Sequence, residues 1–184
     1  MKNKTLFVAA MLMFSALPLR AQDAPKAEVF GGFSLLSVGA PSGFEGNRET
    51  ARGWQASAAY NFHRNVGLVA DFGGQYKTLD EEGSKVSLRG HEFLFGPRFT
   101  ARTEHANPFF HVLLGGANGR ASANSESLSK TVFAAAIGGG LDVNLSDHVA
   151  LRLVQFDWIP IRPEGEWFRN VVRVGFGIVF KGGS

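Results

Sequence analysis

Histidine, serine and acidic residues are the side chains of this sequence that could support hydrolysis or bind a metal. The five histidines are His63, His91, His105, His111 and His148, and the chain contains no cysteine. The absence of cysteine excludes disulfides, thiol nucleophiles and thiolate metal ligands. No pair of histidines has the spacing of a metal-binding motif, so we expect no bound metal.

Catalysis would need a nucleophile, a base and an orienting group in one place. His91 and His111 lie within runs that alternate like strands, but neither is followed two residues later by a serine. Ser84, Ser87 and Ser129 lie near the ends of such runs without a histidine partner in register. We therefore predict no catalytic residues and a protein that is not an enzyme.

Two other motifs could bind ions or phosphates. The acidic run Asp80-Glu81-Glu82 could bind Ca²⁺ weakly, but a Ca²⁺ site needs six or more oxygens from a shaped loop, so we interpret the run as a solvated loop. Gly138-Gly139-Gly140 is not followed by a helical pattern, as a phosphate-binding loop would be. We expect no cofactor.

The N-terminal segment has the pattern of a secretory signal peptide. Lys2 and Lys4 precede the apolar run 6–17, and Pro18-Leu19-Arg20-Ala21 resembles a cleavage region. The apolar run is too short to cross roughly 30 Å of hydrocarbon as a helix. The predicted organisation is a signal peptide at residues 1–21 and one domain at residues 22–184.

The basic charge of the chain belongs to this segment. Of the 19 lysines and arginines, three lie in residues 1–21, which contain no acid, so the remainder has 16 basic and 16 acidic residues. This balance gives no reason to expect a nucleic-acid partner.

Residues 22–184 consist of alternating runs that are separated by turn-forming residues, with almost no helical periodicity. Each run reaches the roughly nine to eleven residues that a tilted membrane-spanning strand needs, and an even strand number is typical of closed bacterial barrels. The eight predicted strands are Ala27–Leu36, Arg52–Phe62, Val66–Tyr76, Val86–Thr100, Phe109–Asn118, Thr131–Asn144, Val149–Pro160 and Trp167–Phe180.

The connections alternate in length, as in an outer-membrane barrel with short turns at one end and longer polar loops at the other. Residues 63–65, 101–108 and 145–148 are short or moderate. Residues 37–51, 77–85 and 119–130 are longer and polar, and residues 161–166 are short but charged.

One face of each predicted strand is bulky and apolar, and the other is small or polar. Trp54, Tyr60 and Phe62 share one face of the second strand, opposite Gln55 and Ser57. The bulky face is too large for the interior of eight strands, whereas the small face fits a narrow lumen. The alternative is a soluble periplasmic β-sandwich or lipocalin-like binding protein, in which the bulky faces form a dry core.

Charged residues on the small face should pair inside the lumen, because an unpaired buried charge is costly. We expect Gln155 opposite Arg173 on neighbouring strands, with Asp157 one diagonal step away. The predicted network comprises Arg173, Asp157, Gln155, Asp71, Glu92 and Arg98. A lumen filled in this way disfavours a pore.

Arg152 does not fit the alternation of the seventh predicted strand. Strict alternation places it on the outer face, together with Phe156 and Trp158. A β-bulge would return Arg152 to the lumen, and snorkelling would carry its guanidinium to the membrane interface. The sequence leaves both interpretations open.

Aromatic residues lie near the predicted strand ends, where a membrane barrel has its interfacial girdles. High β-propensity explains any single one of them equally well. The predicted interfacial aromatics are Trp54, Phe62, Tyr76, Phe99, Trp158 and Trp167.

Together these features resemble the small outer-membrane β-barrel family of the OmpA/OmpX type, over essentially all of residues 22–184. The most specific element is the final strand, where Gly175, Ile178 and Phe180 match the family's C-terminal targeting signal. Residues 27–34 and the hairpin at 140–144 are also similar to the family.

The resemblance implies an all-β fold, an eight-stranded antiparallel up-and-down transmembrane barrel, in the bacterial outer membrane. Its implied partners are outer-membrane lipids, lipopolysaccharide and the barrel-insertion machinery, and a monomer is expected. The implied role is structural or in surface interaction. The alternative role is an outer-membrane lipid-modifying enzyme, because some eight-stranded barrels are acyltransferases or deacylases.

Overall fold

The structure is a computed structural model that describes residues 24–39, 48–81, 84–123, 126–165 and 167–183. The predicted signal peptide at residues 1–21 lies outside this part of the chain. Glu82, the last residue of the acidic run, lies outside it as well.

Eight long strands form a closed antiparallel barrel in the described part of the chain. Each is paired with its neighbours in chain order, and the pairing of β1 with β9 closes the circle. This confirms the predicted fold class. The strands are β1 Ala27–Val38, β2 Glu49–His63, β3 Val66–Glu81, β4 Ser84–Thr100, β5 Ala106–Ala123, β6 Glu126–Asn144, β7 Val149–Trp158 and β9 Val171–Gly182.

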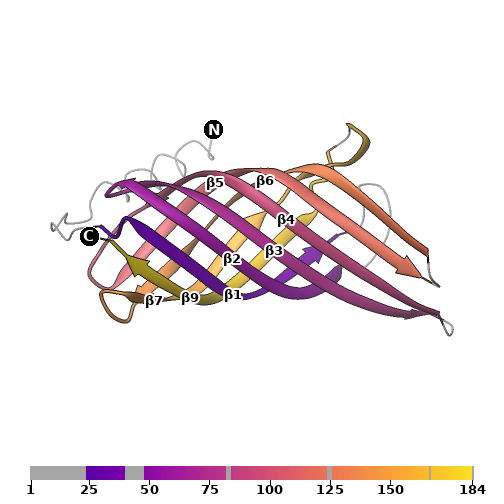
Figure 1. Cartoon of the computed structure of the whole chain (residues 1–184), viewed down its shortest axis with the longest axis horizontal. Coiled ribbons are helices and arrows are strands. Elements are labelled where there is room, and N and C mark those ends of the chain that lie inside the picture. The colour runs from indigo at the N-terminus through magenta and orange to yellow at the C-terminus, as the bar shows by residue number, and fades with distance from the viewer. Residues whose placement is uncertain (1–23, 40–47, 82–83, 124–125, 166, 184) are drawn as a thin grey trace, which may run out of the picture.

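The strands are strongly tilted relative to the barrel axis. A line of directly paired residues that starts at Val66 and passes once around the barrel returns to β3 at Tyr76, ten residues farther along the strand. This stagger forces each strand to cross the axis obliquely, as Figure 1 shows.

Both ends of the described chain meet at one end of the barrel, which we call the terminal end. The backbone N–H of Lys26 donates to the carbonyl oxygen of Gly183 at 2.6 Å. The short β2–β3, β4–β5 and β6–β7 connections lie at the same end, and we call the opposite end the loop end. No helix in the described ranges has the length and apolar character needed to span a membrane.

The hairpins at the loop end are longer than predicted. Much of the predicted connection 77–85 belongs to β3 and β4, which remain paired to Glu81 and Ser84. Most of the predicted connection 119–130 likewise belongs to β5 and β6, which remain paired to Ala123 and Glu126. Backbone pairing continues beyond the apolar part of these strands. The residues there are polar, so they lack the alternation by which strands are predicted from the sequence.

The connection between β7 and β9 also differs from the prediction. It contains the two-residue strand β8, Ile161–Arg162, which pairs with β6, and a 3₁₀ turn η1, Pro163–Gly165. The final strand begins at Val171 rather than Trp167 and continues past Phe180 to Gly182. Trp167 therefore lies before the strand, where its ring packs edge-on against Phe133 at 6.0 Å.

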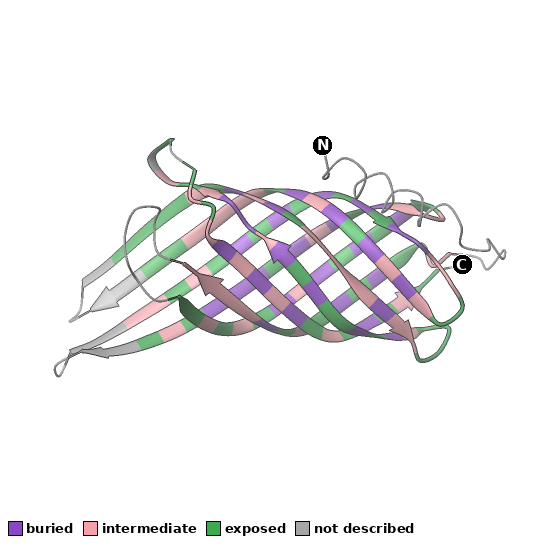
Figure 2. Cartoon of the chain, turned by 180° about the vertical axis from the view of Figure 1, so that it is seen from behind, coloured by how far each residue is buried: buried purple, intermediate pink, exposed green. Residues whose placement is uncertain are grey.

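The barrel is polar inside and apolar outside. Burial alternates along the strands, as the bands in Figure 2 show. Polar and charged residues dominate the buried set, among them Glu28, Gln55, Asp71, Glu92, Arg98, Asp142, Arg152, Asp157 and Arg173. Exposed residues include Phe33, Trp54, Tyr60, Phe62, Phe72, Phe93, Phe95, Phe99, Phe156, Phe176 and Phe180. The sandwich and lipocalin-like alternatives are wrong, because both require the bulky residues inside.

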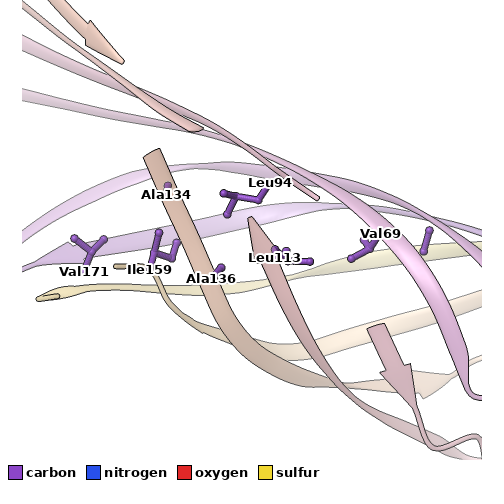
Figure 3. Close-up of a cluster of buried hydrophobic side chains, with 8 residues drawn as sticks. Val69, Leu94, Leu113, Ala134, Ala136, Ile159 and Val171 are labelled. Carbon is purple, nitrogen blue, oxygen red and sulfur yellow. The ribbon is translucent and has the colours of Figure 1, made fainter. Parts of the chain in front are cut away.

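A small apolar cluster also lies inside the barrel. Leu94 of β4, Leu113 of β5 and Ile159, just after β7, are buried there with alanine and valine side chains, and Figure 3 shows this cluster. Leu36 and Val38, among the last residues of β1 before the loop end, pack against this cluster. The lumen is therefore packed by apolar side chains as well as by charged ones.

Arg152 lies inside the barrel, so the outward placement from strict alternation is wrong. The β7–β9 register shifts between Arg152 and Gln155. Leu153 and Val154, between them, are 49% and 44% exposed. Two consecutive outward residues are the mark of a β-bulge, which restores Arg152 to the lumen without placing a charge in lipid.

Candidate functional site: a buried ionic network in the lumen

Arg173 of β9 is the centre of the buried network. Its side chain is 0% exposed and contacts carboxylates from three other strands. Its Nη1 donates to Glu92 Oε1 at 2.6 Å, and its Nη2 lies 2.7 Å from Asp71 Oδ1. Nε and Nη2 both donate to Asp157 Oδ2, at 3.0 and 2.6 Å. A guanidinium carries five donors in a rigid plane, which allows one side chain to link β3, β4, β7 and β9.

Asp157 connects this centre to two further side chains. Its Oδ1 lies 2.7 Å from Nε2 of His111 on β5, and its Oδ2 accepts from Gln155 Nε2 at 2.8 Å. Asp71 is held in the same way by Gln55 Nε2 at 2.7 Å. Both oxygens of Asp157 have hydrogen-bonding partners, which offsets the cost of removing this carboxylate from water, whereas Asp71 Oδ1 has the nearby charge of Arg173 but no hydrogen bond.

Arg152 extends the network toward the terminal end. Its Nε and Nη2 form a bidentate pair with Asp142 of β6, at 2.7 and 3.0 Å, and its Nη1 donates to Gln155 Oε1 at 2.7 Å. The guanidinium lies between the rings of Phe30 and Phe109, 4.2 and 4.3 Å from their centroids. Cation–π contacts add to the ion pair when both groups are desolvated.

A second ionic cluster lies close to the terminal end. Glu28 of β1 accepts from Arg98 Nη2 and from Arg102 Nη2, both at 2.5 Å, and from Asn61 Nδ2 at 2.8 Å. Arg102 also donates to the backbone oxygen of Arg64 at 2.8 Å. This cluster ties β1, β2 and β4 to the β2–β3 and β4–β5 turns.

The two clusters bring together four arginines and five carboxylates. The arginines are Arg98, Arg102, Arg152 and Arg173, and the carboxylates are Glu28, Asp71, Glu92, Asp142 and Asp157. Because the positive and negative side chains are nearly equal in number, they can pair with one another and cross-link the strands through the lumen. In the described ranges no group of three or more histidine and acidic side chains has a metal-binding arrangement.

The six residues proposed from the sequence for the lumen all point inward, but they fall into two clusters. Arg173, Asp157, Gln155, Asp71 and Glu92 are in the central network, whereas Arg98 joins Glu28 near the terminal end. The expected register was wrong by two residues: Asp157 is directly opposite Arg173, and Gln155 is opposite Gly175. The direct opposition explains why Arg173 makes two hydrogen bonds to Asp157.

Sequence reasoning missed several members of the network. Glu28, Gln55 and His111 are on the inward faces of their strands. Strict alternation distinguishes these faces, so it could have identified the three residues as members of the lumen. Asp142 faces inward from β6, whereas Arg152 required knowledge of the bulge.

Each end of the barrel opens into a cavity. The cavity at the terminal end has a volume of about 860 Å³ and is lined by polar turn residues, including His105, His148 and Lys181. The cavity at the loop end has a volume of about 720 Å³ and is lined by apolar residues such as Leu36 and Leu88 and by charged residues, among them Glu49, Lys77, Arg89, Arg120 and Lys130.

The proposed interfacial aromatics lie in two groups on the outer surface. Phe62 and Phe99 are the penultimate residues of β2 and β4, at the terminal end. The other four lie toward the loop end: Trp54, Tyr76, Trp158 and Trp167. Trp54 Nε1 donates to Tyr76 Oη at 3.4 Å, and Trp158 Nε1 donates to the backbone oxygen of Arg169 at 2.6 Å.

The three residues of the proposed targeting signal lie on β9 in two orientations. Ile178 and Phe180 are outward and exposed, whereas Gly175 faces the lumen beside Gln55. The outward pair leaves an apolar surface on the closing strand of the barrel.

The outer membrane protein beta-barrel domain family matches residues 6–156 of this chain. A comparison with curated proteins gave no match. Among solved structures, the attachment invasion locus protein Ail of Yersinia pestis is similar, with 18% identity and a TM-score of 0.61 over 85% of this chain and 98% of Ail.

Two further barrels are similar. Neisserial surface protein A has 12% identity and a TM-score of 0.66 over 87% of this chain and 99% of that protein. The N-terminal barrel domain of Pseudomonas aeruginosa OprF has 13% identity and a TM-score of 0.54 over 86% of this chain and 98% of that domain. At these identities the likeness to all three structures shows the fold.

Outer-membrane barrels have short periplasmic turns and longer extracellular loops, so the terminal end faces the periplasm and the loop end faces outward. The exposed aromatic surface then contacts the lipid of the membrane. The family match covers most of the sequence, and the closed barrel has polar residues inside and bulky apolar residues outside. The chain therefore belongs to the outer membrane protein beta-barrel domain family and lies in the bacterial outer membrane.

Proposed function

We propose that this chain is a non-enzymatic barrel with a structural or surface-interaction role in the cell envelope. The observation that carries the proposal is the cross-linked lumen, in which Arg173 joins carboxylates from β3, β4 and β7. An eight-stranded barrel has an interior just wide enough for side chains to fill it. A lumen packed in this way supports a rigid scaffold rather than a conduit.

Conductance across a planar lipid bilayer tests this proposal. The purified, refolded barrel should produce no steady ion current, because the charged side chains pair across the lumen instead of lining a water-filled path. Arg169→Gln, which changes an exposed arginine near the loop end, is the control and should also be silent. A steady unitary current from the unmodified barrel would contradict the scaffold role and support a pore.

A lipid-modifying enzyme is the competing function, and the hydrogen bonds of the histidines argue against it. In the described part of the chain, His111 contacts Asp157 and His91 contacts Tyr76 Oη, and neither contacts a serine. Mass spectrometry of lipid A from cells that express the chain should detect no added or removed acyl chain. A modified lipid A that disappears with His111→Gln or His91→Gln would establish an enzyme.

The proposed partners are outer-membrane lipid, including lipopolysaccharide, and the insertion machinery during assembly. The outward apolar surface of β9, with Ile178 and Phe180, supports the second partner, because this strand closes the barrel. We propose a monomer, since the closed sheet leaves no unpaired edge among its eight long described strands.

The surface-interaction role concerns the loop end. Ail, which has a similar fold, has been solved in complex with the heparin analogue sucrose octasulfate. The same compound is a suitable probe for this chain, by calorimetry on the detergent-solubilised barrel. Saturable binding would favour interaction with anionic carbohydrate, whereas its absence would favour the structural role.

A further inference from the structure

The cavity at the loop end is bounded by residues from strands β1 to β6. Leu36 of β1, Ala51 of β2 and Leu88 of β4 form apolar walls, and Gln75 of β3 also lines the cavity. Leu36 is paired with Ala51 on one side and with the fully buried Arg173 on the other, so this row of residues faces the lumen. The volume of about 720 Å³ falls within the roughly 300–1,000 Å³ of small-molecule sites, which are mostly apolar with a few polar groups.

Two glycines that lie opposite each other leave part of the cavity wall without side chains. Gly90 of β4 is paired with Gly119 of β5 and, on its other side, with the buried Gln75 of β3, so both glycines face inward. A Cβ at either glycine would meet no atom within 4 Å. We call these two residues the glycine pair.

Other glycines on the inward face have their space filled by a neighbouring side chain. A Cβ at Gly73 would overlap Glu92 Oε1, and a Cβ at Gly138 would overlap Asp157 Oδ1. These glycines make room for the buried ionic network. The glycine pair instead lines space that the described side chains leave open, so this part of the lumen can hold a ligand.

Gln75 brings an unpaired hydrogen-bond acceptor to the cavity. Its Nε2 donates to Ser34 Oγ at 2.7 Å, whereas its buried Oε1, which lies against Gly53, has no hydrogen-bond partner in the described part of the chain. The last torsion of a glutamine side chain is soft, so a small rotation can turn Oε1 toward the cavity. A ligand that donates a hydrogen bond to this oxygen would gain affinity, because an unpaired buried carbonyl is unfavourable.

The charged residues at the cavity already have partners or lie on the opposite face of the sheet. Lys77 forms an ion pair with Glu49, and Lys130 has an interaction partner as well. Arg89 and Arg120 are opposite each other on the outward face of β4 and β5. The apolar walls and the single acceptor therefore favour an uncharged ligand.

We propose that this cavity captures an uncharged, mainly apolar small molecule that carries one hydrogen-bond donor. The apolar body would pack on Leu36, Leu88 and the glycine pair, and the donor would bind Gln75 Oε1. Leu36 also packs against the apolar cluster inside the barrel, so the cavity adjoins a filled part of the lumen and would retain the molecule. This site rests on the proposed surface-interaction role, because the ligand would enter from the loop end.

Protection of a single cysteine in the cavity tests the proposal. Ala51→Cys places the only thiol of the chain on the cavity wall, where a charged methanethiosulfonate reagent can modify the barrel in a lipid nanodisc. The probe is 1-naphthol, which has apolar rings and one hydroxyl donor, and it should slow the modification saturably, as measured by mass spectrometry. The matched probe 1-methoxynaphthalene has no donor and should need a roughly tenfold higher concentration, as expected for one lost hydrogen bond.

Filling the cavity should abolish the protection. Gly90→Leu and Gly119→Leu each place an apolar side chain in open space, without a clash at Cβ, and either change in the Ala51→Cys barrel should remove the effect of 1-naphthol. Gly182→Leu is the matched control and should leave the protection unchanged. A Cβ at Gly182 also meets no atom within 4 Å, but this residue lines the cavity at the terminal end. Heat-dependent gel mobility should show that each variant is folded.

The outcomes separate this site from the broader function. Unchanged modification of Ala51→Cys in the presence of 1-naphthol would overturn the site, and so would protection that survives both glycine substitutions. Equal slowing at Arg169→Cys, on the exposed surface near the loop end, would show that the probe acts through the lipid. Equal protection by the two probes would refute the role of Gln75. The proposed function fails on a different result, steady conductance or lipid A modification, which thiol protection does not measure.

Discussion

Arg152 and Asp142 form a bidentate ion pair at the point where two registers of the barrel shift. The β6–β7 register shifts between Leu141 and Asp142, and the β7–β9 register shifts between Arg152 and Gln155. The pair therefore lies beside the extra residue of the bulge, with Nε–Oδ1 at 2.7 Å. We infer that the buried ion pair and the bulge stabilise each other, since strict alternation would place Arg152 in lipid.

Because of the bulge, we predict that four residues of β7 face lipid, although two of them are at odd and two at even sequence positions. Single cysteines at Leu151, Leu153, Val154 and Phe156 suit this test, because the chain has no native cysteine. A fluorophore attached at each position should be quenched by nitroxide-labelled lipid in a bilayer. All four side chains are at least 36% exposed, so comparable quenching is expected.

Asp147, in the β6–β7 turn, provides the control position outside the bilayer and should show little quenching. If the fluorophores at Leu151 and Leu153 escaped quenching while those at Val154 and Phe156 did not, β7 would alternate strictly. Arg152 would then face lipid, and the account of the bulge would be wrong.

How much of this architecture the sequence predicts depends on local alternation. Alternation assigns Arg173 and Asp157 to the inward face of their strands because each is flanked by bulky apolar residues. It does not set the register between strands, which is why Gln155 rather than Asp157 was expected opposite Arg173. Register depends on the turn and on the bulge, and a bulge has no reliable sequence pattern.

The ends of the strands were difficult to predict for a different reason. Lys77 and Thr78 are paired with Leu88 and Ser87, but they lie where the hairpin extends beyond the membrane. Water contacts more of the sheet there, so polar residues appear on both faces and the period of two disappears. Partners that are distant in sequence, such as Glu28 and Arg102, emerge only when the barrel closes and the side chain of Glu28 contacts the β4–β5 turn.

Gly138→Ala should destabilise the barrel because the lumen beside Asp157 has no room for a methyl group. A Cβ at Gly138 would lie 2.1 Å from Asp157 Oδ1 and 2.4 Å from the backbone oxygen of Phe156. The carboxylate would have to move away from His111 or the strand would have to shift, at a cost of about 1–3 kcal/mol. Urea unfolding in lipid vesicles measures the change.

Gly90→Ala is the matched control for this substitution. Gly90 lines the cavity at the loop end, and a Cβ there would meet no atom within 4 Å. Its free energy of unfolding should stay within about 0.5 kcal/mol of the unmodified barrel. Equal effects of the two substitutions would show that the space beside Asp157 is not limiting.

Phe180→Ala should slow assembly in cells more than it lowers the stability of the folded barrel, because Phe180 ends the proposed targeting signal. The residue is 58% exposed on the lipid side of β9. Pulse-labelled protein that acquires heat-dependent gel mobility reports the assembly rate, and urea unfolding of the refolded barrel reports stability.

Phe176→Ala is the appropriate comparison, since Phe176 is on the same face of the same strand and is 51% exposed. It should cost similar stability and assemble at the normal rate. Normal assembly of Phe180→Ala would reduce Phe180 to one more lipid-facing aromatic residue and would refute the targeting role.

The central claim is that Arg173 binds the strands together from inside the barrel, and a double-mutant cycle on urea unfolding tests it most directly. Arg173→Leu should lower the free energy of unfolding by about 3–5 kcal/mol, because it removes the positive charge that pairs with the buried carboxylates of Asp71, Glu92 and Asp157. Combined with Asp157→Asn, it should cost less than the two single changes together. Arg169→Leu, on the exposed surface, should have little effect. Unchanged or increased stability of Arg173→Leu would contradict the account, because a lipid-facing arginine would gain from replacement by leucine.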